Sequence, residues 1–417
     1  MKARILFLDD EPLALEGLRR MLRTMRSSWD LVFTESGDRA LDLMARSAFD
    51  IVVSDMLMPQ MSGAQLLNEV RRLYPDAARL ILSGHAEREL FFQCFGSAHQ
   101  CLSKPCQPEP LKSALGRVSQ LQAAMQPNAA LRRIVTQMDR FPSVPSLYIE
   151  LVENLLKADV SVKQVALIAR KDPGLTAAIL RLVNSAFFGA AHPISNVTAA
   201  IAYLGLDAFK TLVFNINAFT QIEAVKFRES SLDRLWEHCL EVARAAERIA
   251  EAENADRQTA EAAYTAGLLH DIGGFVLRLD FSHQFQSALK LAEENRMPLS
   301  LAERQIFGVS HADVGAFLLG LWGLPPDIVE AAAWHHSPRM KDASTFSPLT
   351  AVHAANALIQ EHRRNQSRFP PAELDQDYLA SLGLRGRLDD WRRRIVEGSL
   401  ELPNSPSLLG NPNTLTH

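Results

Sequence analysis

Five short apolar runs within the first 106 residues constrain the fold of this chain more than any other feature. The runs are RILFLDD (4–10), LVFTES (31–36), DIVVSDM (50–56), ARLILSG (78–84) and HQCLSKP (99–105). Several are nearly continuous in Val, Ile, Leu and Phe, which is typical of strands covered on both faces. Stretches with helical periodicity separate them. Strands that alternate with helices predict right-handed crossovers and a doubly wound parallel sheet of five strands.

Helical periodicity between the runs completes this α/β pattern. The first such stretch places apolar side chains on one helix face, at Ala14, Leu18, Met21, Leu22 and Met25. A last helix, from about Glu109 to Gln122, closes the region. We therefore predict an N-terminal α/β domain over residues 1–122.

The chain beyond Pro127 is dominated by helical patterns, and we predict no strand there. Ser161-x-x-Gln164 is a capping box, and Asp172-Pro173 combines a side-chain cap with a proline suited to the first helical turn. Long helical patterns cover 146–157, 173–186, 207–222, 232–253, 257–270 and 311–321. We predict a linker over 123–140, an all-α domain over 141–345, a helical extension over 346–400 and a disordered tail over 401–417.

Charge and composition narrow the class of protein. Among 417 residues, 44 Lys and Arg face 48 Asp and Glu, so the net charge of −4 argues against non-specific nucleic-acid binding. No apolar stretch approaches the ~18 residues of a membrane span, and acidic residues follow the N-terminus too early for a signal peptide. Without CxxC spacing, the cysteines are expected to be free thiols: Cys94, Cys101, Cys106 and Cys239. We expect a cytoplasmic protein with no membrane segment.

Polar side chains stand at the carboxyl ends of the predicted strands, where ligands bind in open parallel sheets. They are Asp9, Asp10, Asp55, Ser83 and Lys104, called here the acidic pocket. Crowded carboxylates raise each other's pKa, and Mg²⁺ relieves this repulsion. A carboxylate beside Mg²⁺ can act as nucleophile and form an aspartyl-phosphate. Lys104 would then contact phosphoryl oxygens and Ser83 would donate its hydroxyl, while a cis bond before Pro105 would aim the lysine inward.

These motifs make residues 1–122 similar to the receiver domain of two-component response regulators, a flavodoxin-like fold. The resemblance is carried by FLDDEP, by Asp55 in VVSDMLMPQMSG, by Ser83 in ILSGH and by Lys104 in LSKP. It implies phosphorylation of Asp55 with Mg²⁺ held by Asp10 and Asp55. It also implies a sensor histidine kinase or phosphotransfer protein as partner.

Two features of this region bear on how a receiver signals. Receivers commonly carry Tyr or Phe three residues before the lysine, whereas this chain has Cys101. Signalling through an aromatic switch is therefore not expected. The predicted helix 86–96 carries Phe91, Phe92 and Phe95, which cannot all face one core, so at least one is expected at a partner or interdomain surface.

The second region resembles the HDOD family, a helical module related to HD phosphohydrolases. The resemblance is carried by FPSVPSLYIELVENLL, VALIARKDPGLTAAILRLVNSAFFG, ISNVTAAIAYLGLDAFKTLV, AGLLHDIGGFVL, HADVGAFLLGLWGLP and AAAWHHSP. It implies a non-catalytic signalling module that acts through protein–protein interaction.

Histidines in this region form a candidate metal site for Fe, Mn or Zn. The residues are His238, His270, Asp271, His311, His335 and His336, called here the histidine cluster. Neighbouring residues point ~100° apart in a helix, so both adjacent pairs serve one centre only near helix ends or bends. The resemblance maps the superfamily's His and His-Asp motif to His238, His270 and Asp271.

The chain departs from the catalytic pattern at three points. Asn356 in AVHAANAL stands where the metal-binding Asp is expected, Gly274 replaces the lysine of the HD-GYP phosphodiesterases, and HHSPRM lacks the GYP segment. Losing an anion weakens a site for a dication. Three alternatives follow: a buried hydrogen-bonding cluster, a bound metal without turnover, or working hydrolysis.

Together these patterns predict a cytoplasmic response regulator whose phosphorylatable receiver controls a helical HDOD module. The alternative is a phosphorylation-regulated, metal-dependent phosphohydrolase acting on a cyclic dinucleotide or another nucleotide. We expect downstream signalling proteins as partners and no binding to DNA or membrane, and a homodimer is a candidate state because receivers often dimerise.

Overall fold

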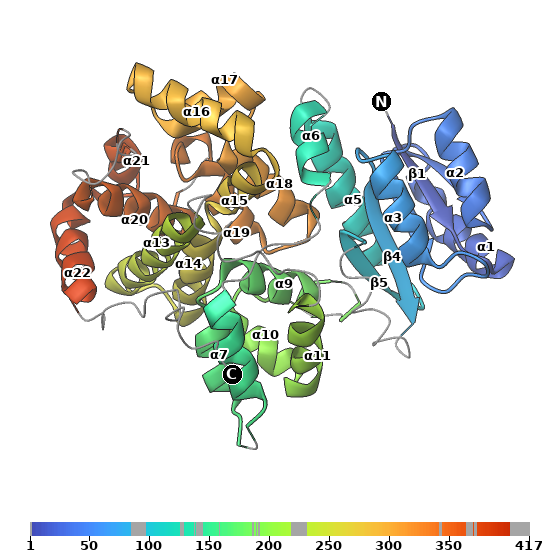
Figure 1. The fold of residues 1–417 in the computed structure, drawn as a ribbon, viewed down its shortest axis with the longest axis horizontal. Helices are drawn as coiled ribbons and strands as arrows, with labels where there is room; N and C mark the ends of the chain where they lie inside the picture. The colour runs from blue at the N-terminus through green and yellow to red at the C-terminus, as the bar shows by residue number, and fades with distance from the viewer. Residues whose placement is uncertain are drawn as a thin grey trace, which may run out of the picture. The chain divides into compact units, whose positions relative to one another are not determined.

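The computed structural model of the chain consists of an N-terminal α/β unit and a helical unit (Figure 1). It describes residues 2–84, 97–125, 129–136, 138, 145–157, 159–185, 187–188, 190, 192–217, 232–341, 344–363, 370 and 373–400. The predicted helix 86–96 with its three phenylalanines and the predicted tail 401–417 lie outside these ranges.

All five predicted strands are present and form one parallel sheet in the order β2-β1-β3-β4-β5. They are β1 (Ala3–Leu8), β2 (Trp29–Thr34), β3 (Ile51–Asp55), β4 (Ala78–Gly84) and β5 (Gln100–Lys104). The order is that of a flavodoxin-like doubly wound fold, which confirms the predicted fold class. The apolar composition of β1 agrees with its central position in this sheet. Its residues Ile5, Leu6, Phe7 and Leu8 are fully buried, as expected of a strand covered on both faces.

The helices of the α/β unit are α1 (Pro12–Met21), α2 (Gly37–Arg46), α3 (Gly63–Leu73), α5 (Pro108–Met125) and α6 (Ala129–Thr136). The expected apolar face of the first helix is split, because α1 ends at Met21 and a 3₁₀ turn, η1 (Arg23–Met25), follows it. Leu18 and Leu22 on this face are buried. The segment predicted as a linker contains α6, so its middle is helical.

Helices make up the rest of the described chain, and no strand occurs there. They are α7 (Pro145–Leu155), α8 (Val162–Ala169), α9 (Pro173–Val183), α10 (Val197–Leu204), α11 (Leu206–Asn217), α13 (Leu232–Ala252), α14 (Arg257–Leu269), α15 (Ile272–Asp280), α16 (Ser282–Asn295), α17 (Leu299–Phe307), α18 (His311–Leu321), α19 (Pro326–Trp334), η3 (Pro338–Met340), α20 (Pro348–His362), α21 (Gln376–Ser381), η5 (Arg385–Arg387) and α22 (Leu388–Leu400). The prediction of an all-α second region is confirmed.

Two helix starts follow from local side-chain chemistry. The Ser161 hydroxyl accepts a hydrogen bond from the Gln164 amide, and the Gln164 side chain accepts one from the Ser161 amide, which completes the predicted capping box of α8. The Asp172 carboxylate accepts a hydrogen bond from the amide of Leu175, and Pro173 opens α9.

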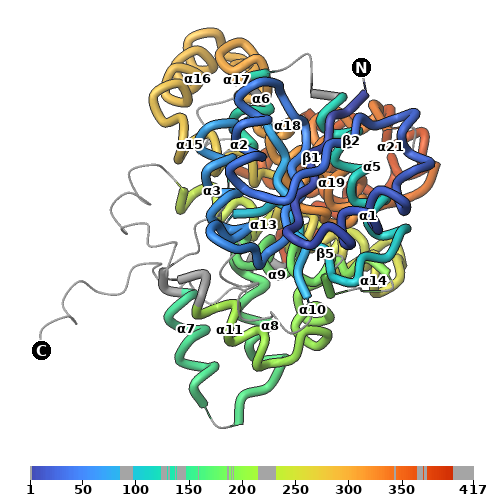
Figure 2. Tube along the Cα trace, turned by 90° about the vertical axis from the view of Figure 1, so that its right-hand side faces the viewer, coloured from blue at the N-terminus to red at the C-terminus, as the bar shows by residue number. Residues whose placement is uncertain are grey.

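Four helices form the part of the helical unit that carries most of the candidate site. The long α13 packs against α14 and α20, and α19 packs against both α14 and α20. Their apolar faces supply the buried core around Val242, Leu268, Ile328 and Val352. Beside them α16 and α17 lie side by side, as two views show (Figures 1 and 2).

No single helix in the described part of the chain is both long and apolar enough to cross a membrane. One bent pair, Val197–Leu204 with Leu206–Phe214, passes the length and composition criteria when the two are taken together.

Candidate functional site

The acidic pocket of the α/β unit brings together four of the five residues expected there, Asp9, Asp10, Asp55 and Lys104, because they stand at the carboxyl ends of parallel strands. Asp9, Asp10 and Asp55 each offer a carboxylate oxygen within 4.8 Å of the others. Asp9 is fully buried and Asp55 is 6% exposed. Lys104, the last residue of β5, pairs with Asp9 at 2.7 Å and also with Asp55.

Burial and ion pairing have opposite effects on the pKa values of Asp55 and Lys104 in the pocket. Burial raises the pKa of Asp55 above its ordinary value, although Lys104 works in the opposite direction. Burial alone would lower the pKa of Lys104, but its hydrogen bonds to Asp55 and Asp9 outweigh this and raise it. The lysine therefore stays charged beside the candidate phosphoryl acceptor. The Lys104–Pro105 bond is cis, as the sequence indicated.

The backbone around Asp55 is packed tightly by the start of α3. The amide of Gly63 donates to the carbonyl oxygen of Met56 at 3.0 Å. A Cβ atom at position 63 would lie 2.0 Å from the carbonyl oxygen of Asp55, so only glycine fits there. Ser83 at the end of β4 is fully buried, and its hydroxyl lies 3.4 Å from the sulfur of Met56.

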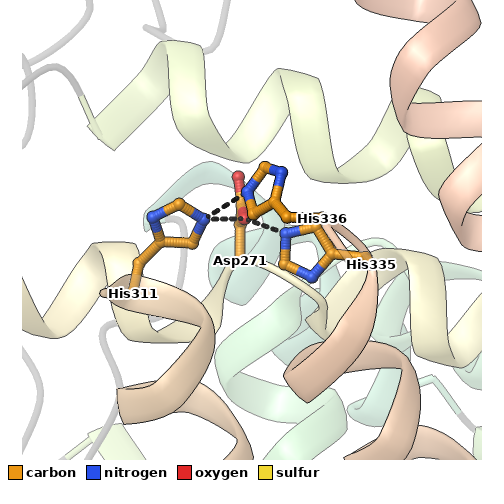
Figure 3. Close-up of side chains that lie close together, drawn as sticks. All are labelled: Asp271, His311, His335 and His336. Atoms are coloured by element: carbon orange, nitrogen blue, oxygen red, sulfur yellow. Dashed lines mark hydrogen bonds and ion pairs between the residues drawn. The ribbon is translucent and has the colours of Figure 1, made fainter. Parts of the chain in front are cut away.

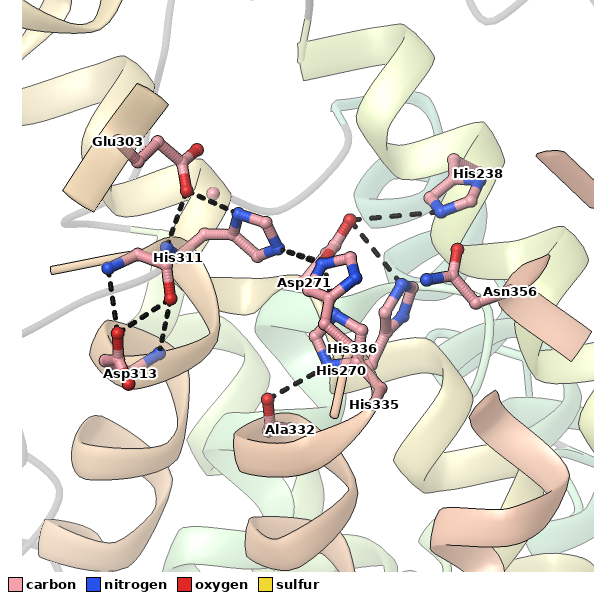
Figure 4. Close-up of polar contacts among 12 residues, drawn as sticks. His238, His270, Asp271, Glu303, His311, Asp313, Ala332, His335, His336 and Asn356 are labelled. Atoms are coloured by element: carbon pink, nitrogen blue, oxygen red, sulfur yellow. Dashed lines mark hydrogen bonds and ion pairs between the residues drawn. The ribbon is translucent and has the colours of Figure 1, made fainter. Parts of the chain in front are cut away.

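The histidine cluster of the helical unit gathers around one carboxylate, that of Asp271 (Figures 3 and 4). On one side, the Nε2 atoms of His311 and His335 lie 3.2 and 3.5 Å from Asp271 Oδ1. On the other side, those of His270 and His238 lie 3.5 and 3.9 Å from Asp271 Oδ2. The donor atoms form two groups that share Asp271: Asp271, His311, His335 and His336, and His238, His270 and Asp271.

Both adjacent pairs stand at helix ends, which is the condition that the sequence required. His270 follows the last residue of α14, and Asp271 precedes the first residue of α15. His335 follows α19, and His336 comes directly after it. The change of backbone direction at these ends lets neighbouring side chains reach one centre. Close packing helps, since a Cβ at Gly273 would lie 2.0 Å from the carbonyl oxygen of His311.

Two ring nitrogens of the cluster, His270 Nε2 and His335 Nε2, are buried and make no hydrogen bond among the described residues, although each lies 3.5 Å from an oxygen of Asp271. Each of these histidines uses its other nitrogen, since His270 Nδ1 lies 2.7 Å from the carbonyl oxygen of Gly267 and His335 Nδ1 lies 3.0 Å from that of Ala332. Donation from Nδ1 leaves the Nε2 lone pair directed at the cluster, an arrangement typical of metal-binding histidines. Burial lowers the pKa of His270 to about 3, which keeps the ring neutral. The donor set therefore fits a divalent transition metal.

Glu303 of α17 is a functional candidate that the sequence analysis missed. Its side chain is fully buried, and one carboxylate oxygen accepts from the backbone amide of His311 at 2.8 Å and lies 2.6 Å from His311 Nδ1. Burial alone would lower the pKa of His311, but Glu303 and Asp271 hold it well above its ordinary value. Glu303 thereby orients His311 so that Nε2 faces Asp271 (Figure 4). A glutamate on the buried face of α17 was the signal available in the sequence.

Asn356 lies on α20 near His238, at the place where the superfamily pattern has an anionic ligand (Figure 4). Its side chain is buried, and its Oδ1 accepts a hydrogen bond from the Gln360 side chain at 2.8 Å. Among the described residues, the cluster thus has the half-buried carboxylate of Asp271 at its centre and the fully buried carboxylate of Glu303 behind His311.

Comparison with protein-family models divides the chain as its fold does. The model described as response regulator receiver domain matches residues 5–116, and the model described as HDOD domain matches residues 141–338. The chain therefore contains a receiver domain followed by an HDOD domain. The acidic pocket lies in the receiver, and the histidine cluster lies in the HDOD part of this receiver–HDOD protein.

Curated relatives match parts of the receiver–HDOD protein. An uncharacterized protein of Treponema pallidum is 24% identical over 204 residues, which cover 49% of this chain and 39% of the relative. The hydrogenase transcriptional regulatory protein HoxA of Bradyrhizobium diazoefficiens is 32% identical over 123 residues, or 29% of this chain and 25% of the relative. The chain thus spans well under half the length of either relative.

Two solved structures are similar to parts of the chain. The MmoQ response regulator of Methylococcus capsulatus is 23% identical with a TM-score of 0.45, covering 62% of this chain and 98% of that one. An HDOD domain protein of unknown function from Geobacter sulfurreducens is 26% identical with a TM-score of 0.37, covering 65% of this chain and 93% of that one.

Proposed function

We propose that the receiver accepts a phosphoryl group on Asp55 and that phosphorylation controls the HDOD module. The observation that carries this proposal is the placement of Lys104 between Asp9 and Asp55, with the three carboxylates converging on one point. Asp10 and Asp55 would hold Mg²⁺, and the carboxylate of Asp55 would attack the phosphorus while Lys104 binds phosphoryl oxygens. A sensor histidine kinase or phosphotransfer protein would supply the phosphoryl group, and the bond between phosphorus and this donor would break as the bond to Asp55 forms, so that the donor side chain leaves.

Labelling with a small phosphodonor tests this assignment. Acetyl phosphate with Mg²⁺ is expected to label the full-length chain, and Asp55→Asn should abolish labelling because the amide is not a nucleophile. Asp50→Asn is a matched control, since Asp50 precedes β3 and accepts from the backbone amide of Arg4 instead of entering the pocket. Undiminished labelling of Asp55→Asn would contradict the assignment.

The output of the HDOD module is proposed to be protein–protein interaction with downstream signalling proteins. Phosphorylation would shift the populations of two receiver states, and only one of them would favour the interaction. Affinity capture with the full-length protein, with and without a phosphoryl mimic on Asp55, should recover different partners. Identical capture in both states and from Asp55→Asn would contradict control by phosphorylation.

A second function, metal binding by the histidine cluster, is favoured by the two buried ring nitrogens, His270 Nε2 and His335 Nε2, that make no hydrogen bond among the described residues. His238, His270 and Asp271 would hold one ion of Fe, Mn or Zn, and Asp271, His311, His335 and His336 would hold another. Such ions polarise phosphoryl oxygens and lower the pKa of bound water. Metal analysis of the purified chain is expected to find such a metal, and His270→Ala should reduce its content. A negligible metal content in both the wild-type protein and His270→Ala would contradict metal binding.

Hydrolysis of a cyclic dinucleotide is the enzymatic alternative. We expect no turnover, because Asn356 supplies no negative charge where a metal-binding carboxylate is needed. The assay incubates Mn²⁺- or Fe²⁺-loaded protein with cyclic di-GMP, with His270→Ala as control. Turnover that disappears in His270→Ala would favour the phosphohydrolase function over a module limited to interaction.

A further inference from the structure

Arg278 of α15 is a charged residue near the histidine cluster to which no role has yet been given. It follows Asp271 by two helical turns, so both stand on the same face, and its side chain reaches back along the helix. Guanidinium Nη1 donates to the carbonyl oxygen of Gly274 at 3.0 Å, and the guanidinium carbon lies 4.4 Å from the centre of the Phe285 ring.

This partly buried guanidinium has no carboxylate partner among the described residues. Its Nε is shut off from solvent and makes no hydrogen bond, while the residue as a whole keeps intermediate exposure. Within the described residues, no carboxylate oxygen lies in ion-pair contact with it; Asp271 and Glu303 act on its charge only from a longer distance. Leaving such a donor unpaired is costly, so an anion that reaches the guanidinium would be bound favourably.

The glycine at position 274 leaves room for the guanidinium of Arg278. A Cβ atom there would lie 2.8 Å from Arg278 Nη1 and 3.3 Å from a methyl carbon of Leu235. The same Cβ would lie 3.9 Å from the Cβ of His311, so the guanidinium stands beside the helix that carries this cluster residue. A side chain at 274 and the guanidinium at its present position therefore exclude each other. The guanidinium of Arg278 can occupy its position because residue 274 has no side chain.

We propose that Arg278 binds the phosphate oxyanion of a phosphorylated ligand at the histidine cluster. The planar guanidinium presents several N–H groups, which match the spacing of phosphoryl oxygens and make charge-assisted hydrogen bonds. Divalent ions on the cluster would bind other oxygens of the same phosphate, so this proposal rests on the proposed metal binding for its full affinity.

Calorimetric titration of the full-length protein with Mn²⁺ and then with inorganic phosphate tests the proposal. Arg278→Met removes the charge and keeps much of the volume, and it should weaken phosphate binding about tenfold or more without changing the Mn²⁺ stoichiometry. Arg304→Met is the matched control, because Arg304 pairs with Asp313 at 3.0 Å on the surface, and its phosphate affinity should stay unchanged.

Moving the cation separates anion binding from a purely structural role. Gly274→Lys in the Arg278→Ala background places an ammonium group in the space that the guanidinium leaves, and it should restore most of the phosphate affinity. Gly274→Lys alone should fold less stably, because the new side chain meets Arg278. If Arg278 served only to pack against Phe285, moving the charge to 274 would restore nothing, and that result would overturn the proposal.

Parallel titrations in chelator-treated protein separate this proposal from metal binding. If Mn²⁺ does not bind, the metal proposal is overturned. If phosphate still binds to that protein and Arg278→Met removes this binding, the role of Arg278 is supported. Normal Mn²⁺ binding with equal phosphate affinity in wild type and Arg278→Met would overturn the role of Arg278 alone. Absence of phosphate binding to wild type, with or without Mn²⁺, would also overturn it.

Discussion

At the scale of single residues, Lys104 shows how one side chain organises the receiver pocket. It contacts two of the three carboxylates and contributes no metal ligand. Lys104→Ala should therefore leave Mg²⁺ binding largely intact, since the three carboxylates remain. It should impair the response to phosphorylation, because a contact to the phosphoryl oxygens is lost. Mg²⁺ titration and affinity capture after acetyl phosphate treatment measure the two effects separately.

The control for this substitution is Lys112→Ala, which removes a half-buried lysine that pairs with Glu109 on α5. It should change neither Mg²⁺ binding nor the response. A large loss of Mg²⁺ affinity in Lys104→Ala would show that the lysine holds the carboxylates in place as well as binding phosphoryl oxygens.

His99, just before β5, gives the receiver a pH-dependent stability. Burial lowers the pKa of His99 well below its ordinary value of 6.5, and Arg79 adds to this; its Nδ1 accepts a hydrogen bond from the Arg79 amide at 2.9 Å. The folded state thus keeps His99 neutral, while the unfolded chain binds a proton below pH 6.5. Stability is full above that pH and falls by about 1.4 kcal/mol for each unit below it.

Urea unfolding of the receiver at pH 7.5 and pH 5.5, followed by hydrogen exchange of its peptides, measures this effect. His99→Gln should be less stable at pH 7.5 and should lose the part of the pH dependence that one proton contributes. An equal decrease of stability between the two pH values in both proteins would contradict the role of His99.

At the scale of elements, the start of α3 is fixed by contact with β3. Gly63→Ala would bring a methyl group against the carbonyl oxygen of Asp55, so it should destabilise the receiver and slow phosphorylation of Asp55. Gly17→Ala is the matched control in α1, because nothing lies within 4 Å of its added carbon. It should stabilise the receiver by about 0.5–1 kcal/mol through higher helix propensity.

Urea midpoints and the rate of labelling by acetyl phosphate check both substitutions. Unchanged stability and rate in Gly63→Ala would mean that α3 and β3 separate easily, contrary to their close packing in the structure.

At the scale of the whole molecule, the helical unit should not depend on metal for its fold. Its core is apolar, with Leu268, Leu269, Val276 and Val352 fully buried around α13, α14, α15 and α20. Packing of this extent stabilises helices without a metal. Treatment with a chelator should therefore lower the melting temperature only slightly, as calorimetry can measure. A decrease of more than about 10 °C would show that the histidine cluster is a structural metal site.

The amino-acid sequence by itself determined where the strands of the receiver lie, where several helices begin, and which residues form the acidic pocket. Continuous apolar runs set the strands, and capping residues such as Ser161 and Asp172 set helix starts, because these effects act between residues near each other in the chain. The pocket was predictable because parallel strands bring their carboxyl ends to one edge whatever the helices do. The requirement that both histidine pairs stand at helix ends also followed from helix geometry alone.

Only the tertiary structure decided how the histidine cluster is built. That Asp271 is shared by two groups of donors depends on how α13, α14, α15, α18 and α19 pack, and no local pattern encodes it. Glu303 and Arg278 escaped detection for the same reason. Their roles come from contacts of side chains with His311 and Gly274 in a packed interior, where burial and the lack of other partners give each charge its effect.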